Sequence, residues 1–239
     1  MSTSKKLSAE AFPALARERR RIVGNRPPRR YFLIVCEGKK TEPNYFDALR
    51  QELPKEMLDR IEIVGEGANT QSLVDRAEAL VEQRKRSGKP PYYHVWVVFD
   101  KDSFPDDDFD NAIASIERKT RAFDNDTPDS LTELPPEHWH SAWSNEAFEL
   151  WYILHFQPET GGAQSRDTYK ATLAKHLGRK YEKNAKDMFR ILHDKTSQAI
   201  ANAEAALKKH APETPHHKKN PATTVHKLVK ELFKYISRA

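Results

Sequence analysis

The sequence predicts an α/β fold: a compact parallel sheet with flanking helices, followed by a helical extension toward the C-terminus. Two short, nearly continuous apolar runs, residues 31–36 (YFLIVC) and 95–99 (VWVVF), are typical of strands that helices cover on both faces. Candidate strands and helices alternate four times between residues 30 and 156, which is the order of a parallel sheet. A chain of 239 residues suffices for one large domain with a smaller appendage.

The first strand, residues 30–36, leads through a short turn into a helix. Thr41 is suited to be the N-cap of this helix, and Pro43 fits its first turn. The next three pairs of strand and helix are expected at residues 61–64 with 70–86, 92–99 with 106–123, and 140–144 with 145–156.

A pair of glycines, Gly161 and Gly162, ends this alternation, and only helical patterns follow. These helices are expected at residues 167–177, 183–209 (interrupted) and 222–236. The chain therefore divides into a basic N-terminal arm and linker (1–29), an α/β domain (30–160) and a helical extension packed on the same domain (161–239).

The net charge of +5 conceals a strong asymmetry along the chain. Residues 1–30 carry a net charge of +7 and residues 166–239 carry +10, whereas residues 31–165 carry −12. An acidic centre between basic flanks suits an anionic polymer on the flanks and metal ions at the centre. Charge alone is more often explained by solvated Lys-rich helix faces, so this pattern supports a metal site only together with other signals.

The single cysteine, Cys36, excludes an internal disulfide, and a reducing cytoplasm is the expected setting. No stretch approaches the roughly 20 apolar residues that a membrane helix needs. We therefore expect a cytoplasmic protein that does not enter a membrane.

Acidic side chains follow two of the expected strands at the point where each strand ends. Glu37 comes directly after the first strand, and Asp100 and Asp102 end the third. Ligands of open α/β sheets bind outside the carboxyl ends of the strands, and residues two apart can point the same way. Carboxylate oxygens are the ligands that Mg²⁺ or Mn²⁺ prefers, and two such ions roughly 4 Å apart can cleave a phosphodiester.

Four segments of the chain resemble the RloB-like proteins, which share the Toprim fold of topoisomerases, DnaG-type primases and OLD-family nucleases. They are residues 37–46 (EGKKTEPNYF), 96–102 (WVVFDKD), 144–156 (SNEAFELWYILHF) and 220–232 (NPATTVHKLVKEL). The resemblance implies a Toprim-like α/β domain.

For the site, the resemblance assigns acid/base chemistry or metal binding to Glu37, and Mg²⁺ binding to Asp100 and Asp102. Glu42 would complete the metal shell. The resemblance further implies a nuclease that acts on DNA or RNA in phage defence by abortive infection. An ABC-type ATPase is the partner it suggests, and the sequence leaves open whether the protein is a homo-oligomer.

Six further residues are candidates for contacts around the metal or with substrate. Asn145 and Glu149 would share one face of the helix at 145–156, whose N-terminus could meet a phosphate. Glu149 could equally be a buried structural partner. Lys39 and Lys40 are placed to neutralise phosphate, and His226 and Lys227 could contact phosphate or supply a general acid, although a lone helical histidine is more often structural.

The sequence thus predicts a Mg²⁺-dependent nuclease whose basic arm and C-terminal helices bind the nucleic-acid backbone. The alternative is a non-catalytic sensor or regulatory subunit that binds a nucleotide or nucleic-acid end and signals to an ATPase. A third hypothesis is a nucleic-acid-binding protein without further activity, and it depends on charge alone.

Overall fold

The computed structural model describes residues 30–58, 60–66, 70–102, 105–125, 137–158 and 161–236. The chain divides into the units Met1–Arg30 and Tyr31–Ala239, and the fold is that of the second unit. The expected basic arm at residues 1–29 lies outside the described residues, and the expected boundary at residue 160 stays a prediction.

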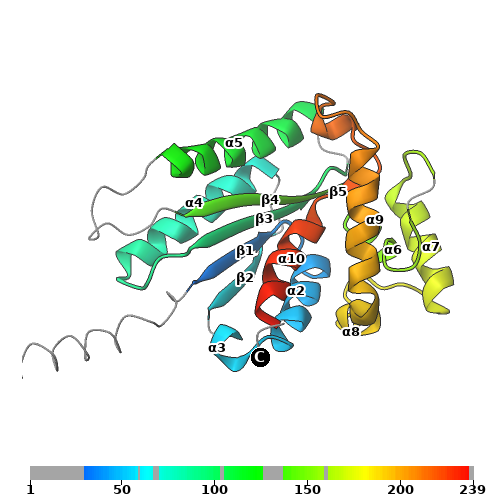
Figure 1. The fold of residues 1–239 in the computed structure, drawn as a ribbon, viewed down its shortest axis with the longest axis horizontal. Coiled ribbons are helices and arrows are strands. Elements are labelled where there is room, and N and C mark those ends of the chain that lie inside the picture. The colour runs from blue at the N-terminus through cyan, green and yellow to red at the C-terminus, as the bar shows by residue number, and fades with distance from the viewer. Residues whose placement is uncertain are drawn as a thin grey trace, which may run out of the picture. The chain divides into compact units, whose positions relative to one another are not determined.

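The described strands form one sheet in the order β2-β1-β3-β4-β5 (Figure 1). The strands are β1 (Phe32–Cys36), β2 (Ile61–Gly65), β3 (His94–Asp100), β4 (His138–Asn145) and β5 (Ala222–Thr223). The first four are parallel, and β5 runs antiparallel to β4. The predicted α/β class, with a mostly parallel sheet flanked by helices as in a Toprim-like domain, is confirmed.

Helices cover both faces of the sheet. As a result, every side chain of β1 and β3 is buried. Side chains alternate along β1, so that Phe32 and Ile34 join one hydrophobic core and Leu33 and Val35 join the other. The first core lies against α2 (Thr41–Gln51), α6 (Glu149–Ile153), α7 (Arg166–Leu177), α8 (Met188–Leu192), α9 (Thr196–Lys208) and α10 (Val225–Ile236). The second lies against α4 (Thr70–Arg86) and α5 (Asp106–Asn125), on the other side of the sheet in Figure 1.

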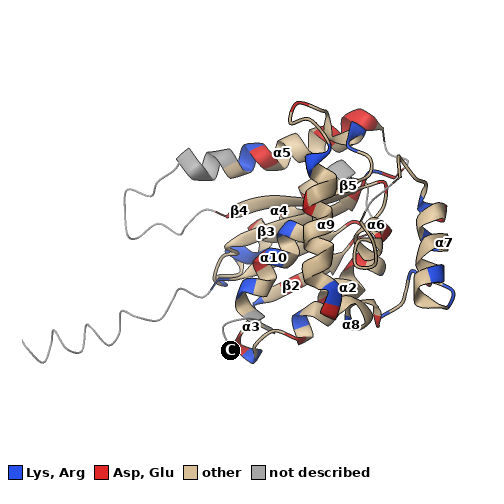
Figure 2. Ribbon diagram, turned by 45° about the vertical axis from the view of Figure 1, so that its right-hand side comes forward, with Lys and Arg blue, Asp and Glu red and all other residues tan. Residues whose placement is uncertain are grey.

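Shorter elements complete the described part of the fold: α3 (Lys55–Leu58), η2 (His193–Lys195) and η3 (His216–Lys218). None of the described helices is long and apolar enough to cross a membrane. Lys and Arg residues are spread over α4, α7 and α10, whereas three acidic residues open α5 (Figure 2).

The predicted helix at 145–156 is wrong in its first part. β4 continues through Asn145, and α6 begins only at Glu149. The side-chain amide of Asn145 donates a 2.8 Å hydrogen bond to the carbonyl oxygen of His217, so it does not cap a helix. Asn145 and Glu149 therefore do not share a helix face.

The predicted helix at 222–236 is also wrong at its start. Ala222 and Thr223 form β5 beside the end of β4, and α10 begins at Val225. The Thr223 hydroxyl accepts a 3.2 Å hydrogen bond from the amide of Val225, which satisfies one free donor of the helix. Two residues are too few to produce a strand pattern in the sequence.

Two smaller expectations also change. The helix expected from residue 183 begins at Met188, and its predicted interruption is present between α8 and α9. Lys40, without a side-chain capping bond, holds the N-cap position of α2. Thr41 instead donates a 3.1 Å hydrogen bond to the carbonyl oxygen of Lys183, which joins α2 to the C-terminal half of the chain.

Candidate active site

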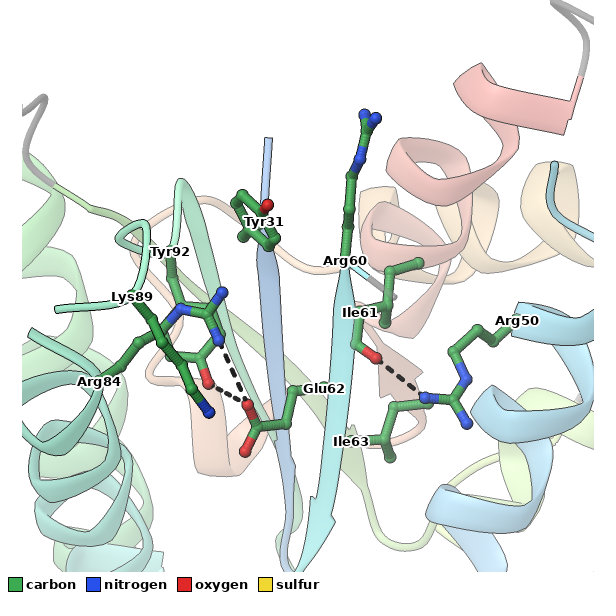
Figure 3. Close-up of a pocket in the computed structure, with 9 residues that line it drawn as sticks. All are labelled: Tyr31, Arg50, Arg60, Ile61, Glu62, Ile63, Arg84, Lys89 and Tyr92. Atoms are coloured by element: carbon green, nitrogen blue, oxygen red, sulfur yellow. Dashed lines mark hydrogen bonds and ion pairs between the residues drawn. The ribbon is translucent and has the colours of Figure 1, made fainter. Parts of the chain in front are cut away.

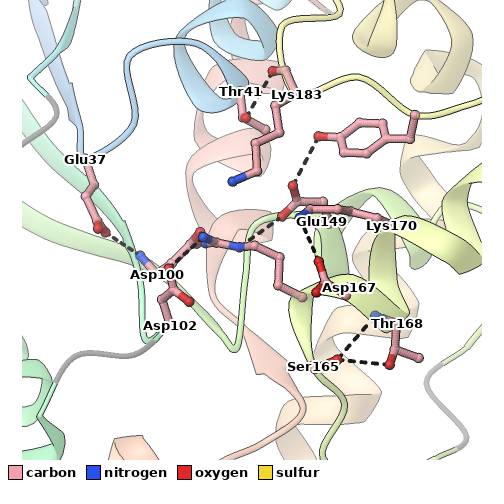
Figure 4. A network of polar contacts seen from close by, with 12 residues as sticks. Glu37, Thr41, Asp100, Asp102, Glu149, Ser165, Asp167, Thr168, Lys170 and Lys183 are labelled. Atoms are coloured by element: carbon pink, nitrogen blue, oxygen red, sulfur yellow. Dashed lines mark hydrogen bonds and ion pairs between the residues drawn. The ribbon is translucent and has the colours of Figure 1, made fainter.

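The two acid-terminated strands lie side by side in the sheet. Cys36, at the end of β1, pairs with Val98 of β3, so Glu37 and Asp100 reach the same edge. The amide of Asp100 donates a 2.9 Å hydrogen bond to Oε2 of Glu37 (Figure 4). The structure thus brings together the carboxylates at the ends of the two strands.

Asp102 follows Asp100 at a turn with an unusual backbone. Its φ of +37° lies in the left-handed region, which Asp adopts more readily than most residues. Such conformations cost free energy and persist only where surrounding contacts hold them. Here the contact is a 2.6 Å hydrogen bond that Oδ2 of Asp102 accepts from Arg166.

Arg166 is the main site residue that the sequence did not predict. Its Nη2 donates a 2.8 Å hydrogen bond to Oδ2 of Asp100, while Nη1 donates to Asp102. Its Nε lies 3.9 Å from Oε2 of Glu149. One guanidinium therefore bridges three carboxylates from β3, the turn after it and α6.

The local sequence does contain a signal for Arg166. Ser165 is the N-cap of α7 and accepts a 3.3 Å hydrogen bond from the amide of Thr168, which places Arg166 first in the helix. The helix dipole favours acidic residues in a first turn, so a cation there needs another partner. A capping serine followed by an arginine could have indicated Arg166 as a candidate site residue.

Glu42 and Glu149 complete a group of five carboxylates, which we call the carboxylate cluster: Glu37, Glu42, Asp100, Asp102 and Glu149. Glu149 is 2% exposed and accepts a 3.3 Å hydrogen bond from the hydroxyl of Tyr181. Glu42 is 5% exposed and lies in the first turn of α2. Tyr181, like Arg166, was not predicted as a site residue.

Gly38 and Gly65 allow this close packing. A Cβ at Gly38 would collide with Oε2 of Glu42 and lie 2.9 Å from its Cδ. A Cβ at Gly65, the last residue of β2, would lie 2.8 Å from both the carbonyl oxygen of Gly38 and Cγ of Pro43. The turn after β1 can therefore fold over the Glu42 carboxylate only because both positions lack a side chain.

Burial and mutual repulsion raise the pKa of three acids of the carboxylate cluster, Glu37, Glu42 and Asp100. Burial raises the pKa of Glu37 to about 7, against the opposing effect of the hydrogen bond from the Asp100 amide. Burial, with repulsion from Glu149, raises the pKa of Glu42 to about 6. Burial and the nearby Glu42 raise the pKa of Asp100 well above its usual value. The cluster has an excess of negative charge for which Arg166 compensates only in part.

The oxygen donors of the carboxylate cluster are of the kind that a divalent cation prefers, but their arrangement in this structure does not form a ligand set. Within the described residues, Oδ1 of Asp100 and Oε2 of Glu42 are buried oxygens without a hydrogen-bond partner, and hard oxygens are the ligands Mg²⁺ or Mn²⁺ takes. In the described parts of the chain, no three His, Cys, Asp or Glu side chains are arranged as ligands around one point. The guanidinium of Arg166 donates hydrogen bonds to both Asp100 and Asp102 and so places its own positive charge between these two acids.

The remaining predicted residues are placed differently. Lys39 and Lys40 are exposed in the turn directly after Glu37. His226 is buried on α10, where Nδ1 donates a 3.1 Å hydrogen bond to the carbonyl oxygen of Thr223. Burial lowers its pKa to about 4, and the charged groups that act on it are Lys227, Glu204 and Lys230. The structure thus does not bring His226, the exposed Lys227 or Asn145 into the carboxylate cluster.

One comparison with known proteins gives a match. The model of a family described as RloB-like protein matches residues 32–232, which contain the whole sheet and every residue of the carboxylate cluster. No curated protein and no solved structure matches the chain.

Proposed function

Because this chain belongs to the RloB-like protein family, we propose that the carboxylate cluster is the active site of a metal-dependent nuclease. The observation that carries this proposal is the convergence of acids from separate elements at the carboxyl edge of a parallel sheet. In the part of the chain that the structure describes, two of their oxygens are buried without a hydrogen-bond partner, and Arg166 is bonded to Asp100 and Asp102.

Glu37, Glu42, Asp100 and Asp102 would hold Mg²⁺ or Mn²⁺. When bound, such an ion supplies charge stabilisation at a phosphoryl oxygen and an acidified water for hydrolysis. Glu37, whose pKa is raised to about 7 by burial, is suited to accept or return a proton near neutral pH. The Asp100 amide fixes the Glu37 carboxylate in position, since it donates to Oε2.

Substrate contacts would come from cations around the carboxylate cluster. Lys39 and Lys40 are exposed next to Glu37, where they can neutralise a phosphate without reading sequence. Arg166 would exchange carboxylate partners for a phosphate oxygen once a metal ion binds the acids. DNA and RNA both satisfy these contacts.

We extend the proposal to phage defence by abortive infection, with an ABC-type ATPase as partner. This part follows from the family resemblance, and the contacts within the chain neither add to it nor conflict with it. A partner ATPase would act by controlling access to the carboxylate cluster or its affinity for metal.

A non-catalytic sensor is the second candidate, and the position of Arg166 favours it. A guanidinium bound to both Asp100 and Asp102 at 2.8 and 2.6 Å neutralises acids that a nuclease would use for metal. In such a protein the carboxylate cluster would be a structural ion network, and a nucleotide or nucleic-acid end would bind without turnover.

The test is cleavage of labelled single- and double-stranded DNA and RNA with Mg²⁺, with Mn²⁺ and with a chelator. We expect metal-dependent cleavage that Asp100→Asn abolishes. Asp107→Asn, at an exposed position of α5, is the matched control and should cleave as wild type. Equal cleavage by the Asp100 variant would refute the assignment, and binding without any cleavage would favour the sensor.

A further inference from the structure

A hollow of about 390 Å³ opens at the opposite end of β1 and β2 from the carboxylate cluster. Figure 3 shows it around β2, with Arg50 of α2 on one side and Arg84 and Lys89 on the other. Tyr31, just before β1, and Arg60, just before β2, also line it. The hollow is therefore built at the amino ends of strands whose carboxyl ends face the proposed active site.

The hollow is strongly cationic. Among the described residues, three arginines and one lysine line it, together with one acid, Glu62. Glu62 is already engaged, because it accepts a hydrogen bond from the Tyr92 hydroxyl and lies 3.7 Å from Nη1 of Arg84. Among the described residues, no carboxylate pairs with Arg60 or Lys89.

Two of the cations are held in place before any ligand arrives. Arg84 lies over the rings of Tyr31 and Tyr92, at 4.8 and 4.3 Å from their centroids, and its Nε donates to the carbonyl oxygen of Pro90 at 2.5 Å. Arg50 donates a 2.9 Å hydrogen bond to the carbonyl oxygen of Ile61. Side chains that are fixed in advance lose less conformational entropy when they bind an anion.

Arg50 also has unused hydrogen-bonding capacity. Its Nη2 pairs with Asp47 at 3.0 Å, whereas its Nε is buried and has no hydrogen-bond partner within the described residues. Arginine presents several donors in a rigid fork that matches phosphate oxygens. A phosphate in the hollow would add a charged acceptor beside this guanidinium, which is only partly satisfied within the described residues.

We propose that this hollow binds the phosphate groups of a nucleic-acid strand at a second site, separate from the carboxylate cluster. Residues 1–30, which precede Tyr31 directly, carry a net charge of +7, which favours a polyanion over a small free phosphate. The choice of a nucleic acid as the polyanion rests on the proposed function. The presence of the cationic hollow does not depend on the proposed function.

The second site would position the substrate at a fixed distance from the chemistry. Glu37 lies six residues after Tyr31, which corresponds to roughly 20 Å along an extended strand. A strand of several nucleotides can span that distance, whereas a mononucleotide cannot. The hollow would therefore select for polymer length.

The test is binding of a fluorescent oligonucleotide of roughly 20 nucleotides to the full chain in a chelator, so that no cleavage occurs. We expect Arg60→Glu and Lys89→Glu each to weaken binding about tenfold and to reduce the salt slope by about one. Arg118→Glu, an exposed position on α5, changes the net charge equally and should alter binding less than about twofold. Glu62→Gln should strengthen binding.

Thermal unfolding of each variant separates lost binding from lost folding, and Lys89→Gln provides a milder change at an exposed side chain. Wild-type affinity in both charge-reversal variants would overturn the proposal. Competition by inorganic phosphate at the same phosphate concentration as the oligonucleotide would also overturn it, in favour of a free-phosphate site. If Asp100→Asn cleaves normally while the hollow variants lose binding, the proposed active site fails and the second site stands.

Discussion

Arg166, the first residue of α7, donates a 2.8 Å hydrogen bond to Asp100, the last residue of β3. This contact places a cation from the C-terminal half of the chain at the carboxyl edge of the sheet. Burial of Asp100 would otherwise leave a carboxylate with little solvent and several acidic neighbours. A metal ion at the same oxygens must therefore compete with a cation that the protein supplies itself.

Arg166→Met should lower the melting temperature of the metal-free protein, because it leaves the carboxylate cluster without its bonded cation. Loss of one partner from a buried ion pair costs about 3–5 kcal/mol, and less where solvent reaches the pair as it does here. Mg²⁺ should then raise the melting temperature of the variant by more than it raises that of wild type. Differential scanning calorimetry with and without Mg²⁺ measures both effects.

Arg179→Met is the control for this prediction, since Arg179 pairs with Asp187 at 2.6 Å on the surface. Its melting temperature should change little, because exposed ion pairs contribute about 0–1 kcal/mol. An equal response to Mg²⁺ in wild type and in Arg166→Met would show that the guanidinium and the metal do not compete.

Gly38→Ala should destabilise the protein and disturb the carboxylate cluster. The new methyl group would occupy the space of the Glu42 carboxylate, and overpacking of this kind costs typically about 1–3 kcal/mol. Urea denaturation gives the change in unfolding free energy. Gly162→Ala is the matched control, because no atom of the described residues lies within 4 Å of a Cβ at that position. Equal stability of the two variants would contradict the packing described for Glu42.

His226 should make the protein less stable as the pH falls from about 6.5 toward 4. Burial lowers its pKa from 6.5 to about 4, so in this window the unfolded chain takes up a proton that the folded chain does not. Glu37, whose pKa is raised to about 7, has the opposite effect between about 4.5 and 7. The difference between wild type and His226→Asn isolates the histidine.

The unfolding free energy of wild type relative to that of His226→Asn should therefore fall as the pH is lowered from about 6.5 to 4, as followed by urea denaturation at several pH values. The same substitution at His193, which is 49% exposed, controls for the general effect of replacing a histidine. Identical slopes for wild type and His226→Asn would show that burial of this ring does not set its proton affinity.

The proximity of Glu37 and Asp100 could be predicted from the sequence because it follows from patterns of neighbouring residues. Apolar runs identify the two strands, parallel order aligns their carboxyl ends, and the acids stand directly after them. The contribution of Arg166 could not be predicted in this way. It is separated from Asp100 by 66 positions, and only the packing of α7 against α6 brings the two together.

The errors in the fold share a cause. β5 has two residues and α6 has five, so neither is long enough to show a periodic pattern. Both are fixed by contacts with distant parts of the chain, as in the 2.8 Å hydrogen bond from the Thr224 amide to the carbonyl oxygen of Trp143. Elements that tertiary contacts define cannot be read from local spacing.

The pairing of Thr223 with Ser144 has a consequence for the protein during its synthesis. Ser144 is the neighbour of Asp100 in the sheet, so the strand beside the acids gains its outer partner only when residue 223 has been translated. The acids themselves are all present by residue 149, and their arginine follows at residue 166. A growing chain on the ribosome therefore carries the acidic residues for some time before β5 can pair with β4 beside them.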